Sequence, residues 1–259
     1  MSYSLDFALK THPGLVRPLN EDAIGADPRC GLFVLADGLG GYNAGEVASV
    51  MAISSVLDRL SSALDASRTE DGVFTPDEAI YDTVSEINAS IYNAALNSAA
   101  FEGMATTLVI GWFLGGRLWV AHTGDSRLYR YRHSQLDQLT RDHSFSQELL
   151  DAGMVTEAEA RMLPAKNLVT RALGASADIE PEINDVDVEA GDVILLCSDG
   201  LTEMVGSYEI EGLLSISEDN LHETARHLVD LANEAGGRDN VSVIVVRVSS
   251  AAEAPSSEP

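Results

Sequence analysis

The chain has 259 residues, of which 45% are hydrophobic, so one domain of this length can bury a sizeable core. Its 41 Asp and Glu residues outnumber 16 Lys and Arg residues, which gives a formal net charge of −25. This charge should repel nucleic acids and anionic membranes, so we expect neither as a partner. It should also repel phosphate, and a phosphate site would need bound metal ions or another local source of positive charge.

Two features bear on the compartment. The N-terminal residues MSYSLDFALK carry no signal-peptide pattern, and no apolar run approaches membrane-spanning length. Cys30 and Cys197 lie in apolar runs without the spacing of a metal site, which favours buried free thiols in a reducing compartment. We therefore expect a cytoplasmic protein. We also expect the protein to be a monomer.

The first third of the chain predicts two strands and a helix. Residues 3–10 alternate between apolar and polar side chains, as a half-buried strand does, and a turn follows at residues 12–14. Residues 17–22, RPLNED, join one arginine to two adjacent acids, either in an exposed loop or in a site. Residues 32–36 are apolar and too few for a helix, so they predict a buried strand that ends at Asp37.

Asp37 leads into a glycine-rich turn. Four glycines within residues 38–45 let the backbone bend tightly and approach whatever Asp37 holds. A helix with an apolar stripe from Val47 to Leu60 follows, and residues 61–72 have the composition of a polar link. Asp37 either caps that helix or holds a hard metal ion.

The middle of the chain changes from helix to strand. A capping box at residues 75–78, with proline at the first helical position, predicts a helix that runs to about residue 100. Residues 105–139 then predict a meander of about four antiparallel strands, with a hairpin turn at residues 115–116.

Residues 140–175 interrupt the strand pattern. They predict two short helices, one over residues 144–152 and one capped at Thr156 with Glu159. Because a segment with so little strand character lies beside a sheet, we expect a mobile flap at about residues 144–166. His143 at its start is expected to be a structural hydrogen-bonding residue rather than a base.

Strands resume in the last third. They are predicted at residues 179–188, 193–197 and 241–248, with a helix at about residues 220–234. Residues 249–259 are acidic and have the composition of a disordered tail. No repeat or internal boundary is visible, so we expect one domain over residues 3–248.

Four aspartates stand at predicted strand edges: Asp37, Asp125, Asp199 and Asp239. Gathered in one place without a counter-charge, they would repel one another strongly. Divalent cations would hold them together, and oxygen ligands alone favour Mg²⁺ or Mn²⁺ over zinc or copper.

Eight motifs in this order resemble the metal-dependent Ser/Thr protein phosphatases of the PPM family, also called type 2C, in their compact bacterial form. They are RPLNED (17–22), ADGLGG (36–41), GE (45–46), MATTL (104–108), GDSRLY (124–129), LTRDHS (139–144), SDGLT (198–202) and GRDNVS (237–242). The resemblance implies an α+β fold, a four-layer α-β-β-α sandwich in which two antiparallel sheets are flanked by helices.

The resemblance also implies roles for the site residues. Asp37 would bridge two Mn²⁺ or Mg²⁺ ions, the Gly38 carbonyl would bind one, and Asp199 and Asp239 would complete the other. Glu21 and Asp22 would act through metal-bound waters, and Arg17 would hold the substrate phosphate. Asp125, with Asp199, resembles the third metal site of bacterial members.

The implied activity is hydrolysis of phosphoserine and phosphothreonine in proteins, such as the targets of a Ser/Thr kinase. A water or hydroxide bridging the two metals would attack phosphorus directly, and no phosphoenzyme would form. Leu39 departs from the animal pattern, where a histidine is assigned to protonate the leaving oxygen. The general acid is therefore left unassigned, and so is Glu203, where relatives often have aspartate.

Other phosphate chemistries lack their motifs. A cysteine phosphatase needs C-x5-R, but Glu203 follows Cys197 by six residues and Ala36 follows Cys30 by six. An aspartyl-phosphate enzyme needs D-x-D-x-[TV], but Glu189 stands in the last position after residues 185–188. The competing function is a catalytically silent PPM-like module that binds phosphoproteins, which would be expected to lose metal-binding aspartates. A dedicated regulatory phosphatase would differ only in its substrate.

Overall fold

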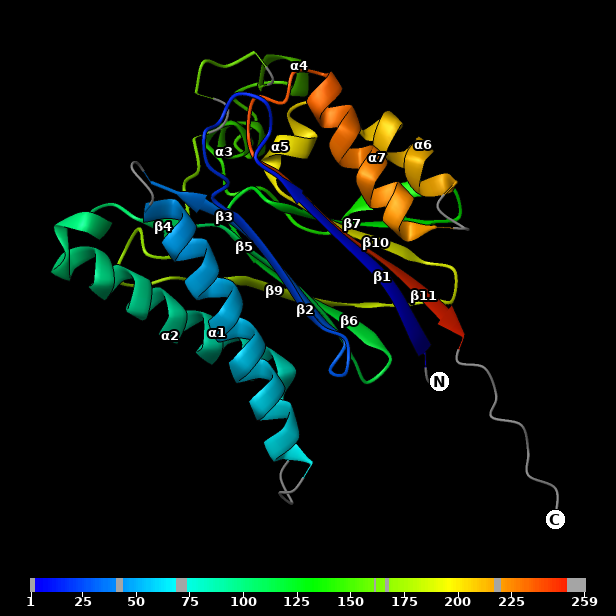
Figure 1. Cartoon of the computed structure of the whole chain (residues 1–259), viewed down its shortest axis with the longest axis horizontal. Coiled ribbons are helices and arrows are strands. Elements are labelled where there is room, and N and C mark those ends of the chain that lie inside the picture. The colour runs from blue at the N-terminus through cyan, green and yellow to red at the C-terminus, as the bar shows by residue number, and fades with distance from the viewer. Residues whose placement is uncertain are drawn as a thin grey trace.

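Two antiparallel sheets pack face to face, and helices cover the outer face of each (Figure 1). The computed structural model describes residues 3–40, 44–68, 74–160, 162–165, 168–216 and 220–250. The first sheet has the strand order β1 (Tyr3–His12), β11 (Val241–Ser250), β10 (Val193–Cys197), β7 (Arg127–Arg132) and β8 (Gln135–Gln138). The second has the order β2 (Asp22–Asp27), β3 (Leu32–Leu39), β5 (Leu108–Leu114), β6 (Arg117–Thr123) and β9 (Glu182–Asp187), with β4 (Ala105–Thr106) paired to β3.

The helices complete a four-layer sandwich, which confirms the predicted fold class. The second sheet is covered by α1 (Ala44–Ser67) and α2 (Pro76–Asn97), and a short 3₁₀ turn, η1 (Ala99–Phe101), follows α2. The first sheet is covered by α5 (Asp199–Thr202), α6 (Ser207–Ser215) and α7 (Leu221–Glu234). The predicted insertion contains α3 (Phe145–Asp151) and α4 (Glu157–Ala160).

Alternation along each strand divides the core into three apolar layers. On β3, Leu32 and Val34 pack toward α1 and α2, whereas Phe33 and Leu35 pack between the two sheets. These residues are fully buried, and removing each such side chain from water contributes about 1.5–3 kcal/mol. The same period of two carries the inter-sheet series of β3 on to Asp37, at the end of the strand.

Helix α1 is longer than predicted. The expected polar link at residues 61–72 is wrong for residues 61–67, which remain helical. Leu64 is buried one turn after Leu60, so the apolar stripe continues beneath the polar residues that suggested a loop. Residues 69–72 of that link lie outside the described part of the chain.

By length and composition alone, α1 could cross a membrane, so the expectation that no apolar run approaches that length is wrong for this helix. Within the fold its buried face packs against β2, β3 and α2, which is how the core helix of a domain behaves.

The predicted four-stranded meander is wrong, because its strands belong to two sheets. β5 and β6 form a hairpin in the second sheet, and β7 and β8 form a hairpin in the first. The chain crosses between the sheets at Gly124, whose φ of 106° is in the region that favours glycine. Asp125 therefore lies at the crossover instead of at the end of a regular strand pair.

The remaining expectations agree with the structure in most places. The helices predicted near residues 76–100, 144–152 and 220–234 are present with slightly different ends. Thr156 and Glu159 form their capping box, whereas the Thr75 hydroxyl bonds the Glu78 side chain and caps no backbone amide. Strand β2 and helices α5 and α6 were not predicted, and residues 251–259 of the tail lie outside the described residues.

Candidate active site

The predicted acidic residues are carried to the site by both sheets. Asp22 and Asp37 are direct partners in the antiparallel ladder of β2 and β3. Asp199 opens α5 just after β10, and Asp239 precedes β11. The strand edges singled out in the sequence therefore meet at one end of the sandwich.

The pKa values show that the carboxyl groups interact. Burial raises the pKa of Asp37 well above its usual range, and repulsion from Asp22, Asp199, Asp125 and Asp239 raises it further. Burial and the charge of Asp125, followed by that of Asp239, raise the pKa of Asp199 in the same way. The structure thus brings the four predicted aspartates and Asp22 into one electrostatic cluster.

Burial also disfavours the charged forms of Asp22 and Asp125 within the cluster. Burial raises the pKa of Asp22 to about 6, although the hydroxyls of Ser242 and Ser198 oppose the rise. Burial, followed by the charge of Asp142, raises the pKa of Asp125 to about 7. Glu203 also lies close enough to raise the pKa of Asp125 and of Asp199, so it borders the cluster.

The donor set fits hard divalent cations. The Oδ1 atom of Asp22 is buried and has no hydrogen-bond partner among the described residues, which is costly for a carboxylate unless a cation or water meets it. The surrounding side-chain donors are carboxylate oxygens, the ligand type of Mg²⁺ and Mn²⁺. A cation would also relieve the repulsion that raises the pKa values of Asp37 and Asp199.

Gly38 brings three chain segments together beside Asp37. A Cβ atom at Gly38 would lie 2.3 Å from the Gly45 carbonyl oxygen and 2.6 Å from that of Glu21. No larger residue fits this close approach, and the Gly38 amide donates to the Glu21 carbonyl at 3.1 Å. The first turn of α1 and the end of the RPLNED segment are thereby held against the strand end.

Glu21 and Arg17 lie at the margin of the cluster. Burial raises the pKa of Glu21, whereas the charge of Arg17 and a hydrogen bond from the Gly45 amide oppose the rise. The guanidinium of Arg17 donates to Asp239, with Nη2 2.7 Å from Oδ2, and half of the Arg17 side chain remains exposed. The predicted phosphate-binding cation is therefore in place beside the carboxylates.

Several supporting residues were not predicted from sequence. Asn240 accepts from the Glu21 amide at 2.8 Å and donates to the carbonyls of Pro13 and Leu19, so it fixes the loop that carries Arg17. Thr107 accepts from the Asp37 amide at 2.9 Å. Asn240 stood beside Asp239 in a recognised motif, which is a signal that could have indicated it.

A second group of possible metal ligands consists of His122, His143 and Glu182, whose ligand atoms lie within 4.8 Å of one another. His143 Nδ1 accepts from the Gly124 amide at 3.2 Å, so in its neutral form its proton lies on Nε2, which faces Glu182 at 3.2 Å. His122 Nε2 lies 2.7 Å from the Arg141 carbonyl. These contacts confirm His143 as a structural hydrogen-bonding residue, and burial lowers the pKa of both histidines.

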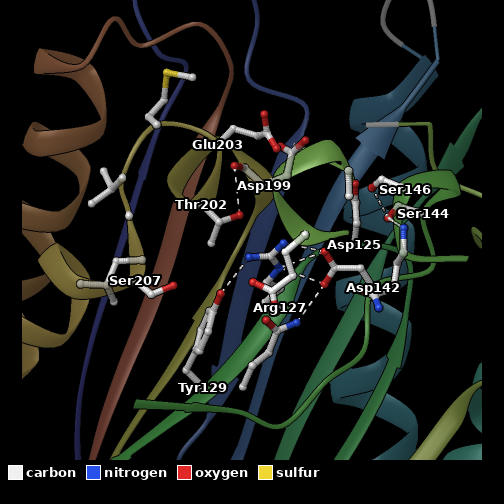
Figure 2. A pocket seen from close by; sticks show the side chains of 18 of the residues that line it. Asp125, Arg127, Tyr129, Asp142, Ser144, Ser146, Asp199, Thr202, Glu203 and Ser207 are labelled. Atoms are coloured by element: carbon white, nitrogen blue, oxygen red, sulfur yellow. Dashed lines mark hydrogen bonds and ion pairs between the residues drawn. The ribbon is translucent and has the colours of Figure 1, made fainter. Parts of the chain in front are cut away.

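A cavity of about 550 Å³ opens beside Asp125 and Asp199, between β7, the predicted flap and helices α5 and α6. Figure 2 shows Ser144 and Ser146 of the flap region on one side and Ser207 of α6 on the other. Arg127 lines the cavity, and its guanidinium donates to both Asp142 oxygens and to the Tyr129 hydroxyl. The cavity therefore joins the acidic cluster to the flap, whose mobility stays a prediction.

Fold and site define a four-layer α-β-β-α sandwich with a buried oxygen-donor cluster where its two sheets meet. The family model of protein phosphatase 2C matches residues 17–236. The chain belongs to this family.

Two relatives that are similar in sequence agree with that assignment. The Serine/threonine protein phosphatase PstP of Mycobacterium tuberculosis is 39% identical over 251 residues, which are 94% of this chain and 45% of PstP. The Serine/threonine phosphatase stp of Listeria innocua is 37% identical over 92% of this chain and 93% of its own length. This chain therefore spans less than half of PstP but nearly all of the Listeria protein.

A solved structure gives the same result in three dimensions. The catalytic domain of PstP, in complex with two manganese ions, superposes with a TM-score of 0.83 at 36% identity, covering 96% of this chain and all of that one. The family assignment, the fold and the two manganese ions of the PstP structure are thus consistent with the donor set described above.

Proposed function

We propose that the protein is a metal-dependent Ser/Thr protein phosphatase that hydrolyses phosphoserine and phosphothreonine in proteins. The observation that carries the proposal is the buried cluster of Asp22, Asp37, Asp125 and Asp199, whose mutual repulsion demands cations, with Arg17 at its margin. The printed names of the PstP and stp relatives support the same activity.

The proposed ligands follow the positions of the carboxylates. Asp37, the Gly38 carbonyl, Asp199 and Asp239 would hold two Mn²⁺ or Mg²⁺ ions, and Asp125 with Asp199 would hold a third. Glu21 and Asp22 would contribute through water. Ions bound there would supply positive charge for the phosphate and lower the pKa of a water that serves as nucleophile.

Arg17 would orient the substrate. Its guanidinium can donate two parallel hydrogen bonds to phosphate oxygens, a geometry that a lysine ammonium cannot match. Half of its side chain is exposed, so a phosphate group can reach it from solvent.

Water is the proposed nucleophile, and no phosphoenzyme is expected. Cys197 is fully buried, and burial raises the pKa of its thiol to about 12, which leaves almost no thiolate at neutral pH. His143 has both ring nitrogens in hydrogen bonds within the fold, and His122 Nε2 lies against the Arg141 carbonyl. Leu39 pairs with Ala105 in the β3–β4 ladder and has no proton to give to the leaving oxygen.

The substrates would be phosphoproteins, such as the targets of a Ser/Thr kinase, met by a monomeric enzyme in the cytoplasm. A catalytically silent, phosphoprotein-binding module is the alternative. The retention of all the predicted aspartates in one cluster favours the enzyme.

A hydrolysis assay distinguishes the phosphatase from the catalytically silent module. Hydrolysis of p-nitrophenyl phosphate and of phosphoserine and phosphothreonine peptides is measured with Mn²⁺, with Mg²⁺ and with a chelator. The proposal predicts turnover of both substrate types with metal and none with chelator. Binding of phosphopeptides without turnover under every condition would identify the silent module.

A further inference from the structure

The apolar layer between the sheets ends in a set of polar side chains next to the acidic cluster. Along each inner strand face, the alternation that places apolar residues between the sheets continues to a hydroxyl or a carboxylate. The residues reached in this way are Thr11 after Leu9, Asp22 before Ile24, Asp37 after Leu35, Ser198 after Leu196 and Ser242 before Ile244. Three hydroxyls carried by the first sheet and two carboxylates of the second therefore lie at the same end of the layer between the sheets.

Ser198 connects the two sheets directly. Its hydroxyl donates to Asp22 Oδ2 at 2.8 Å and accepts from the Ser242 amide at 3.0 Å. The Ser198 amide donates in turn to the Ser242 carbonyl at 3.1 Å. Ser198 and Ser242 are fully buried and Asp22 is nearly so, which makes this polar contact a fixed part of the core.

A second line of donors reaches Asp22 from β1. The Asn20 side chain donates to the Thr11 hydroxyl at 2.7 Å, and the Thr11 and Ser242 hydroxyls lie 2.7 Å apart. The Ser242 hydroxyl also faces the Asp22 carboxylate and favours its charged form. Because Thr11 already accepts from Asn20, its own hydroxyl proton can be donated to Ser242, which leaves the Ser242 proton for Asp22.

The arrangement leaves the two Asp22 oxygens unequal. Oδ2 accepts from Ser198, whereas Oδ1 is buried and has no hydrogen-bond partner among the described residues. We propose that Ser198, Ser242 and Thr11 are positioning residues, which hold Asp22 so that one oxygen stays available to the metal cluster. The inference rests on the proposed function, because it assumes that divalent ions bind beside Asp22.

A purely structural role would have a different signature. Hydroxyls that only tie the sheets together would, when removed, lower the free energy of unfolding without changing metal affinity. Positioning residues behind a metal site act on the affinity itself, and losing such a partner typically weakens metal binding about 10- to 100-fold.

The experiment measures Mn²⁺ binding to the full chain by isothermal titration calorimetry, without substrate. Ser198→Ala removes the direct donor and is expected to raise the Mn²⁺ Kd about tenfold. Because Ser198 also precedes Asp199, the distant Thr11→Val provides an independent arm, since it removes only a hydroxyl on β1. It should raise the Kd in the same direction by a smaller factor, and Thr11→Ser, which keeps the hydroxyl, should bind as the wild type does.

Thr224→Val is the matched control, because it removes a buried hydroxyl from α7 that donates to the Asn220 carbonyl, away from the acidic cluster. Thermal midpoints of the metal-free variants show that each one folds. In hydrolysis assays, saturating Mn²⁺ should restore most of the kcat of Ser198→Ala. Wild-type Mn²⁺ affinity in folded Ser198→Ala and Thr11→Val would overturn the inference while leaving the proposed function intact. A wild-type protein that binds no Mn²⁺ would overturn both.

Discussion

Arg17 and Asp239, separated by 222 positions in the chain, form an ion pair with Nη2 2.7 Å from Oδ2. Both side chains are partly exposed, with 52% of Arg17 and 37% of Asp239 accessible. An exposed pair of this kind contributes at most about 1 kcal/mol, so a doubly charged phosphate can displace it. The contact places the phosphate-binding fork within reach of the carboxylates that we expect to hold the cations.

Arg17→Ala should therefore weaken substrate binding more than turnover. A hydrogen bond to a charged group contributes about 1.5–3 kcal/mol, which corresponds to a rise in KM of roughly tenfold or more. Arg17→Lys should recover only part of the loss, because an ammonium cannot bond two phosphate oxygens in parallel. The measurement is steady-state hydrolysis of p-nitrophenyl phosphate with Mn²⁺. Arg29→Ala, which removes another exposed, ion-paired arginine, is the control. An unchanged KM in Arg17→Ala would contradict the role.

Asp37→Asn should abolish Mn²⁺-dependent hydrolysis and make the metal-free protein more stable. Burial and four neighbouring carboxylates disfavour its charge, so the neutral amide relieves a repulsion that no cation balances. A gain of 1 kcal/mol raises the melting temperature of a protein of this size by roughly 2–4 °C. Calorimetry with chelator measures the gain, and Asp58→Asn on the exposed face of α1 is the control. Turnover near the wild-type rate would refute the assignment of Asp37.

How much of this site the sequence could reveal depends on the kind of residue. Asp37 and Asp199 each end an apolar run in an Asp-Gly pair, and such a pattern can be recognised in the sequence alone. Ser198, Ser242 and Thr11 carry no such mark, because serine and threonine are common in loops and strands alike. Only the register that pairs β1 with β11, and β10 with β11, shows that their hydroxyls share one face.

The fold was predictable to a similar degree. Strand and helix types followed from periodicity, but the sheet to which each strand belongs did not. Residues 117–132 look like one continuous strand series, and the crossover at Gly124 leaves no stronger signal than an ordinary turn. The sequence predicted too early an end for α1, because after Leu60 only Leu64 continues the apolar stripe of the helix among polar neighbours.

The metal-free protein should lose stability as pH rises from 5 to 8. The pKa of Asp22 is raised from 3.8 to about 6, and that of Asp125 to about 7. Between those values and 3.8 the folded state binds more protons than the unfolded state, so the free energy of unfolding falls with rising pH. Carboxyl groups with lowered pKa, such as Asp27 at about 2, have finished titrating below pH 5. The lowered pKa values of His122 and His143 oppose the trend below pH 6.5, but the carboxyl groups with raised pKa, which include Asp37 and Asp199, outnumber these two histidines.

Thermal midpoints with chelator, taken across that range, check this expectation. Saturating Mn²⁺ should flatten or reverse the trend, because cations favour the charged carboxylates. A chelated protein that gains stability steadily from pH 5 to pH 8 would show that the cluster is not repulsive.

The two thiols should be inert in the folded protein. Cys30 and Cys197 are free and buried, and burial raises the pKa of Cys197 to about 12. Reaction with a chromogenic disulfide reagent at pH 8 should therefore be slow under native conditions and complete for both thiols in denaturant. Rapid native labelling would be incompatible with the buried position of either residue.

The flap should select among protein substrates without affecting a small one. Leu150 on α3 lines the cavity beside Asp125 and Asp199, whereas Glu148 on the same helix is exposed and does not line it. Leu150→Trp would fill part of this space, and we expect a change in the relative kcat/KM of different phosphopeptides. Turnover of p-nitrophenyl phosphate should persist, because that substrate needs only the carboxylate cluster and Arg17. Glu148→Trp adds the same bulk outside the cavity and should leave both unchanged. Equal loss on small and peptide substrates in Leu150→Trp would mean that the flap supports the fold of the site instead of selecting substrates.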